Sequence, residues 1–189
     1  MVGQALTQSP QRHLPRVPSP KGAWRFLESS QLYSEELRID LAKRNDSVYF
    51  RWFLASLLFG ARISETTAKN TYRSFVRHGL TNPQKILTAG WDFLVSPVMR
   101  EGGYVRYDGR KSTQILRDCE TLVADYGGSL SRLHDVARNA RDLEERLLAF
   151  YGVGPVTMNI FLREMRPFWA KADSGSSACC QNTGETAFD

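Results

Sequence analysis

The chain has 189 residues and 42% apolar side chains, enough for one hydrophobic core but too few for a large multidomain enzyme. Lysine and arginine (25) exceed aspartate and glutamate (20), so the formal charge is +5 and an acidic partner is favoured over a basic one. Three cysteines are too few for a four-cysteine iron–sulfur or zinc site, and their odd number argues against a disulfide framework. Because no run of about 18 apolar residues occurs, we expect a soluble, cytoplasmic protein without a membrane span.

Composition divides the chain into three parts. Residues 1–23 are rich in glutamine, serine, arginine and proline, which predicts a disordered basic arm. Residues 174–189 are small and polar without periodicity, which predicts a disordered tail. The apolar residues are concentrated in 24–173, the segment that we expect to form the folded domain.

Helical periodicity runs through this segment, and no window alternates with period two over the length of a strand. In chain order we expect a helix capped by Ser34, a buried helix over Ser47–Phe59, a helix capped by Ser64, a helix opened by Asn82–Pro83, and further helices over Trp91–Val98, Lys111–Tyr126 and Ser131–Arg138, then a last pair on either side of Gly152–Gly154. The sequence therefore predicts an all-α fold, a bundle of orthogonal helices.

The last helix pair carries the most specific pattern. Gly152, Val153 and Gly154 form a short glycine-rich turn, and Pro155 opens the second helix, as in a helix-hairpin-helix motif. Glycines allow close approach of the backbone to a phosphate, the new helix offers unpaired N–H groups, and Thr157 adds a hydroxyl donor. An ordinary corner between two helices is the alternative interpretation of this turn.

Four motifs in series resemble the endonuclease III-like helix-hairpin-helix DNA glycosylases. Their order and spacing are similar to those of that family over about two thirds of the chain. The motifs are Leu57-Leu58-Phe59-Gly60-Ala61-Arg62-Ile63-Ser64, Tyr107-Asp108-Gly109-Arg110-Lys111-Ser112, Leu148-Ala149-Phe150-Tyr151-Gly152-Val153-Gly154-Pro155-Val156-Thr157 and Ala172-Asp173.

This resemblance implies base-excision repair: binding of double-stranded DNA, extrusion of a damaged or mispaired base and cleavage of its N-glycosidic bond. The family's catalytic aspartate corresponds to Asp173 here. A carboxylate about 4 Å from an oxocarbenium-like sugar stabilises it by roughly 4 kcal/mol at an effective dielectric constant near 20. A helix cap or an exposed loop charge is the alternative role for Asp173.

The chain departs from the family pattern at the position of the lysine nucleophile. Bifunctional members carry that lysine two residues after the second hairpin glycine, where this chain has Val156. The resemblance therefore implies a monofunctional glycosylase without a lyase step. Lys111 matches a family lysine for which phosphate contact or helix capping is the simpler role. Arg62 follows Ala61, the position of the family's duplex-wedging glutamine, and is expected to fill the gap left by an extruded base, with a surface salt bridge as the alternative. The DNA-binding residues that the resemblance implies are Gly152, Val153, Gly154, Val156, Thr157, Lys111 and Arg62.

The match stops at Asp173, so the chain resembles a C-terminally truncated, incomplete family member, with the apolar faces of Phe161, Phe168 and Trp169 expected to be uncovered. We expect no metal and no iron–sulfur cluster, although the hairpin carbonyls of family members can hold a monovalent cation. Three hypotheses remain open: a monofunctional DNA glycosylase, a catalytically inactive DNA-binding remnant of one, and a helical interaction protein.

Overall fold

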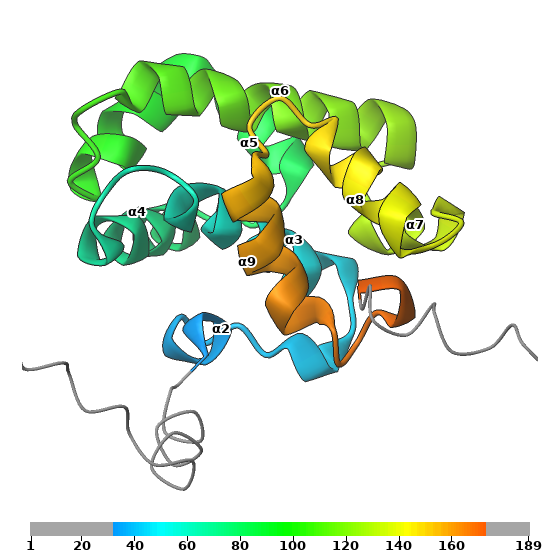
Figure 1. The fold of residues 1–189 in the computed structure, drawn as a ribbon. Coiled ribbons are helices and arrows are strands. Elements are labelled where there is room, and N and C mark those ends of the chain that lie inside the picture. Colours follow the sequence, from blue (N-terminus) through cyan, green and yellow to red (C-terminus); the bar gives the residue numbers. More distant parts are fainter. Residues whose placement is uncertain (1–31, 173–189) are drawn as a thin grey trace, which may run out of the picture. The chain divides into compact units, whose positions relative to one another are not determined.

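The computed structural model of the chain describes residues 32–172, and these residues form helices and turns without a strand, which confirms the all-α prediction (Figure 1). The elements are α2 (Tyr33–Glu36), η1 (Leu41–Lys43), α3 (Asp46–Phe59), α4 (Glu65–Arg77), α5 (Pro83–Phe93), the π-helical η2 (Leu94–Met99), α6 (Asp108–Tyr126), α7 (Leu130–Val136), α8 (Ala140–Leu148), α9 (Pro155–Met165) and η3 (Ala170–Ala172). The predicted arm 1–23, the predicted tail 174–189 and Asp173 all lie outside the described residues.

Helix α3 is the centre of the folded part. Ten of its 14 residues are buried, and it packs against α4, α7 and α9. Trp52 is fully buried and donates its indole N–H to the backbone carbonyl of Phe161 in α9 at 3.1 Å. Figure 1 shows α9, in orange, crossing α3, while the long helix α6 runs beside α5 and also contacts α7. The apolar character of α3 on every side is therefore explained by partners on several sides.

Side-chain caps set most of the helix starts. The predicted cap at Ser64 is confirmed, since its hydroxyl accepts from the backbone N–H of Thr67 at 3.1 Å. The predicted start at Asn82–Pro83 is also confirmed, with the Asn82 carboxamide accepting from Lys85 N–H at 2.9 Å. These caps need only local chemistry, which is why the sequence identified them.

The predicted cap at Ser34 is wrong. Ser34 lies inside the four-residue helix α2, and its backbone N–H donates to the carboxylate of Glu164 in α9 at 3.1 Å, as does that of Tyr33. The cap of α2 is thus a buried carboxylate 130 residues away along the chain. No local pattern encodes a partner at that separation.

The helix predicted over Trp91–Val98 is confirmed in its first part and is interrupted at Ser96. Trp91 belongs to α5, beyond a kink at Gly90, whose φ of 75° lies in the left-handed region. Pro97 then lies inside the π-helical segment η2, where Leu94 and Val98 are fully buried. Ser96, the residue before Pro97, has an extended backbone with φ −142° and ψ 116°, so the helix is broken at the proline, as proline favours.

The aromatic side chains near the end of α9 are covered, contrary to the prediction for a truncated chain. Phe161 and Trp169 are 1% and 3% exposed, while Phe168 is partly buried. The Trp169 ring makes edge contacts with Tyr49 and Phe161, with centroids 5.4 and 5.5 Å apart. The chain therefore covers these faces itself. Among residues 32–172, no helix is both long and apolar enough to cross a membrane.

Candidate nucleic-acid interface

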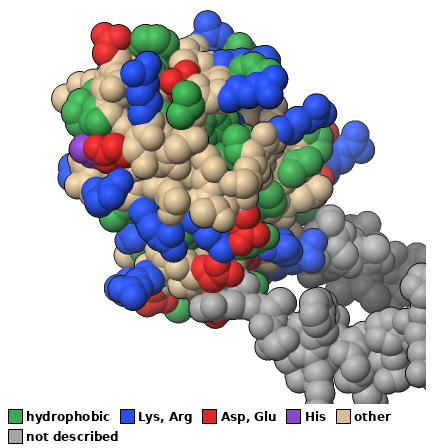
Figure 2. Space-filling view, turned by 90° about the vertical axis from the view of Figure 1, so that its left-hand side faces the viewer, with side chains coloured by type: hydrophobic (Ala, Val, Ile, Leu, Met, Phe, Trp, Pro, Cys, Tyr) green, Lys and Arg blue, Asp and Glu red, His purple; other side chains and the backbone are tan. Residues whose placement is uncertain are grey.

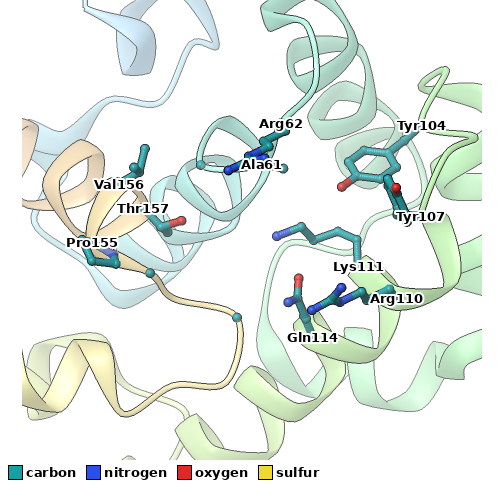
Figure 3. Close-up of a pocket in the computed structure, with 13 residues that line it drawn as sticks. Ala61, Arg62, Tyr104, Tyr107, Arg110, Lys111, Gln114, Pro155, Val156 and Thr157 are labelled. Atoms are coloured by element: carbon teal, nitrogen blue, oxygen red, sulfur yellow. The ribbon is translucent and has the colours of Figure 1, made fainter.

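A pocket of about 510 Å³ lies where three segments of the chain meet (Figure 3). One segment follows α3, the second leads into α6, and the third joins α8 to α9. The lining residues are Gly60, Ala61, Arg62, Tyr104, Tyr107, Arg110, Lys111, Gln114, Gly152, Gly154, Pro155, Val156 and Thr157. The volume is within the range of about 300–1,000 Å³ that is usual for small-ligand pockets.

Six of the seven residues that the sequence suggested as DNA contacts line this one pocket: Arg62, Lys111, Gly152, Gly154, Val156 and Thr157. The seventh, Val153, is 7% exposed, and its side chain belongs to the hydrophobic core. The sequence motifs thus converge in space although up to 95 residues separate them. The other lining residues are Gly60, Ala61, Tyr104, Tyr107, Arg110, Gln114 and Pro155. Of these, Tyr104 and Gln114 lie in none of the motifs quoted from the sequence.

The start of α9 presents unpaired donors to this pocket. Gly154 is the N-cap residue and offers no side chain to cap the helix, and Pro155 occupies the first turn. Within the described part of the chain, the backbone N–H groups of Gly154, Val156 and Thr157 donate to no acceptor. Such groups, together with the positive end of the helix dipole, favour an anion at this place.

Asp118 holds the preceding turn in place and was missed by sequence reasoning. Its carboxylate accepts from the backbone N–H of Gly152 at 2.9 Å, while its Oδ2 atom is buried without a partner among residues 32–172. Burial raises the pKa of Asp118 to about 6, although the Gly152 amide and the Lys111 ammonium act in the opposite direction. A Cβ at residue 152 would lie 2.3 Å from that Oδ2, so glycine is required beside this carboxylate.

Gly60 is the other glycine of the pocket lining at which a side chain has no room. A Cβ there would lie 1.9 Å from the hydroxyl oxygen and 3.1 Å from the Cα of Thr157. With glycine at position 60, the end of α3 approaches the start of α9 more closely than any side chain at that position would allow. By contrast, a Cβ at Gly154 would meet nothing within 4 Å, and its φ of −100° suits any residue.

Lys111 is buried at the floor of the pocket, with 6% of its surface exposed. Its ammonium donates to the backbone carbonyl of Leu57 in the last turn of α3 at 3.0 Å. It therefore caps a neighbouring helix, and Figure 3 shows its amino group directed into the space between α6 and the start of α9. Burial lowers the pKa of Lys111 to about 8, an effect that the Asp118 carboxylate partly offsets.

The charge of the pocket is one-sided. Its charged lining residues are Arg62, Arg110 and Lys111, and no carboxylate of the described segment lines it. On the face drawn in Figure 2, lysine and arginine side chains cover more of the surface than aspartate and glutamate side chains do. This distribution favours an anionic or acceptor-rich ligand.

The turn that precedes Asp173 is anchored elsewhere. The Lys171 ammonium donates to the backbone carbonyls of His134 and Asp135 at 2.8 and 3.1 Å, at the end of α7. Trp169 packs on Tyr49 in the first turn of α3, whereas the pocket opens beyond the last turn. Asp173 follows this turn and lies outside the described residues.

Within the range 32–172, no group of three or more histidine, cysteine, aspartate or glutamate side chains is arranged to hold a metal ion. Comparisons with family models, curated proteins and solved structures found no match to this chain.

Proposed function

We propose that this chain is a helix-hairpin-helix DNA N-glycosylase that binds double-stranded DNA with the pocket face and releases a base from it. The observation that supports this function is the convergence of six sequence-selected residues on one cationic pocket beside the uncapped start of α9. The order of the motifs in the sequence supports it independently. A helical interaction protein has no comparable need for such a pocket.

In this proposal the α8–α9 turn is the docking point for the DNA backbone. A phosphate at the start of α9 accepts from the free N–H groups of Gly154, Val156 and Thr157, and the helix dipole adds to the attraction. Arg62 and Arg110 are exposed at the pocket, where they neutralise further phosphates. Asp118 holds the turn from inside, so the free donors face outward. A monovalent cation at the hairpin carbonyls stays a prediction.

The pocket then receives the extruded base, as base-excising enzymes require. Asp173, which matches the family's catalytic aspartate, stabilises the oxocarbenium-like sugar and orients the attacking water in this scheme, and for this the chain beyond Ala172 has to reach the pocket from the end of α7. Val156 lines the pocket but carries no amine, so base release takes place by hydrolysis without an imine at that position, as in a monofunctional glycosylase.

Two substitutions at Gly154 test the docking point, because this position has room for a side chain. Gly154→Ser adds a neutral N-cap, and Gly154→Asp adds an equally good cap that carries a negative charge. We expect Gly154→Asp to weaken duplex affinity about tenfold relative to Gly154→Ser, because it removes a phosphate contact. The measurement is fluorescence anisotropy with a labelled duplex over a series of salt concentrations.

Val136→Asp makes the same charge change at an exposed position at the end of α7, away from the pocket, and serves as the control. Equal affinities for Gly154→Asp, Gly154→Ser and the control would contradict docking at the start of α9.

Base release is tested on a panel of lesion-bearing duplexes, with abasic sites detected by alkaline cleavage. Wild-type protein should release a base, and Asp173→Asn should bind equally well but release it at a rate lower by about a thousandfold, the worth of one stabilising charge. Duplex binding without release from any member of the panel would identify the inactive remnant instead. Absence of duplex binding would leave the helical interaction protein.

A further inference from the structure

We propose that the pocket selects deaminated bases, hypoxanthine over adenine and uracil over cytosine, and that Lys111 is the residue that distinguishes them. This inference rests on the proposed function, since it takes the same pocket as the place of the extruded base. It adds the class of base that the pocket accepts.

Three charged side chains of the pocket can only donate hydrogen bonds, whereas those of Tyr104, Tyr107, Gln114 and Thr157 can both donate and accept. Arg62, Arg110 and Lys111 can only donate, and no carboxylate from residues 32–172 lines the pocket to accept from an amino group. Asp118, the nearest buried carboxylate on α6, is directed to the Gly152 amide instead. A ligand atom that faces one of these three cationic side chains therefore needs to be an acceptor.

Lys111 is the donor with the most restricted position. It is 6% exposed, whereas Arg62 and Arg110 are exposed and can turn into water. One of its three N–H groups is used by the Leu57 carbonyl, and the other two have no acceptor among the described residues. With a pKa of about 8, the group is an ammonium at neutral pH. Figure 3 shows it directed into the pocket, with Gln114 and Thr157 nearby.

Deamination changes whether the group that faces such a donor can accept a hydrogen bond. It replaces the exocyclic amino group of adenine or cytosine by a carbonyl oxygen, so a donor becomes an acceptor without a change in ring size. The Lys111 ammonium pairs with that oxygen, whereas an amino group at the same place leaves two buried donors unpaired. Sites built around a buried polar group discriminate strongly against the analogue that cannot pair with it.

The test uses four duplexes that differ only in one base, which is hypoxanthine, adenine, uracil or cytosine. Each base is placed opposite a tetrahydrofuran abasic residue, so that no partner base holds it in the helix. We expect wild-type protein to bind the hypoxanthine and uracil duplexes about tenfold more tightly than the adenine and cytosine duplexes, the size of one good base contact. The readout is the dissociation constant by anisotropy.

Lys111→Met keeps the length of the side chain and removes the donor, so both preferences should fall to about one. Lys171→Met is the matched control, because this lysine also donates to backbone carbonyls but lies at the end of α7. The control should keep the preference. Titration of free hypoxanthine and free adenine, followed by tyrosine fluorescence, measures the same preference without DNA.

Equal or reversed affinities in wild-type protein would overturn the inference, and so would a preference that survives in Lys111→Met. Equal binding of all four duplexes would leave the proposed DNA binding intact. Failure to bind any duplex would contradict the proposed function, and the free-base titration would then decide the base preference: a preference for free hypoxanthine supports it, and equal binding overturns it.

Discussion

The two ends of α9 are built from opposite chemistry. At its end, Glu164 is 3% exposed and accepts from two backbone N–H groups of α2, and Trp169 packs on Tyr49 and Phe161. At its start, the N–H groups of Val156 and Thr157 have no acceptor within the part of the chain that the structure describes. Polar groups that are paired inside the chain stabilise the fold, whereas unpaired ones facing a cationic pocket are available to a ligand.

The largest expected effect is at the contact between the start of α9 and α3. Gly60→Ala places a methyl group 1.9 Å from the Thr157 hydroxyl oxygen and within 3.1 Å of its Cα, so one of the two helices must move. We expect a loss of about 3 kcal/mol in the free energy of unfolding. Urea denaturation measures it, and Gly154→Ala, which meets nothing within 4 Å, should change stability far less. Equal losses for the two variants would contradict the close approach.

The second prediction concerns the paired end of α9. Glu164→Ala removes the acceptor of the Tyr33 and Ser34 amides, and Ser34 is itself buried. We expect a loss of about 2 kcal/mol in the free energy of unfolding, because buried donors lose their partner. Duplex affinity should stay within about twofold of wild type, since only the start of α9 contacts DNA in our proposal. A change in duplex affinity as large as that caused by Gly154→Asp would contradict the prediction that the end of α9 does not contact DNA.

A double-mutant cycle tests whether Asp118 is the reason that position 152 requires glycine. Gly152→Ala should cost about 1–2 kcal/mol in wild-type background, because the new methyl group lies 2.3 Å from Asp118 Oδ2. In the Asp118→Ala background that clash is absent, and the same substitution should cost less. The difference is measured as a coupling free energy from four denaturation curves. A coupling of zero would mean that Asp118 does not set the need for glycine at 152.

The smallest expected effect is the pH dependence caused by Lys111. Its pKa falls from 10.5 in the unfolded chain to about 8 in the folded one, so the unfolded chain binds more protons between these values. The free energy of unfolding is therefore highest above pH 10.5, where Lys111 is neutral in both states. It decreases as the pH falls from 10.5 through 8. From pH 7 to 9, wild-type protein should gain about 1 kcal/mol relative to Lys111→Met. The charged groups around the ammonium are Asp118 and Arg110 on α6 and Arg62 beyond α3.

Parallel denaturation curves of wild-type protein and Lys111→Met at pH 7, 8 and 9 measure this difference. Curves whose separation does not change with pH would show that Lys111 is not buried as an ammonium.

Local signals in the sequence were sufficient for much of the fold. Asn82–Pro83 and Ser64 start helices as predicted, and the apolar run of α3 lies in the core. The failure at Ser34 has a tertiary cause: this residue is not a cap because the Glu164 carboxylate takes that role. That outcome depends on a contact between segments that are 130 residues apart in the sequence.

Some features of the candidate site were likewise indicated by the sequence, and others followed only from the folded structure. Glycine spacing around residues 152–154 and the motif order indicated the residues that meet at the pocket. The role of Asp118 carried no sequence signal beyond its place on the same helical face as Lys111, seven residues earlier. The coverage of Phe161 and Trp169 was likewise a result of folding, since Tyr49 lies more than 100 residues away.

The sequence by itself determined the helical class, most helix starts and the set of residues with a chemistry suited to DNA, because periodicity, caps and glycine turns act over a few residues. Only the tertiary structure decided which of these residues share a pocket, that Lys111 is buried rather than exposed, and which end of α9 is left unpaired. The reason is physical: burial and hydrogen-bond partners depend on which distant segments come into contact, and local sequence patterns do not specify those contacts.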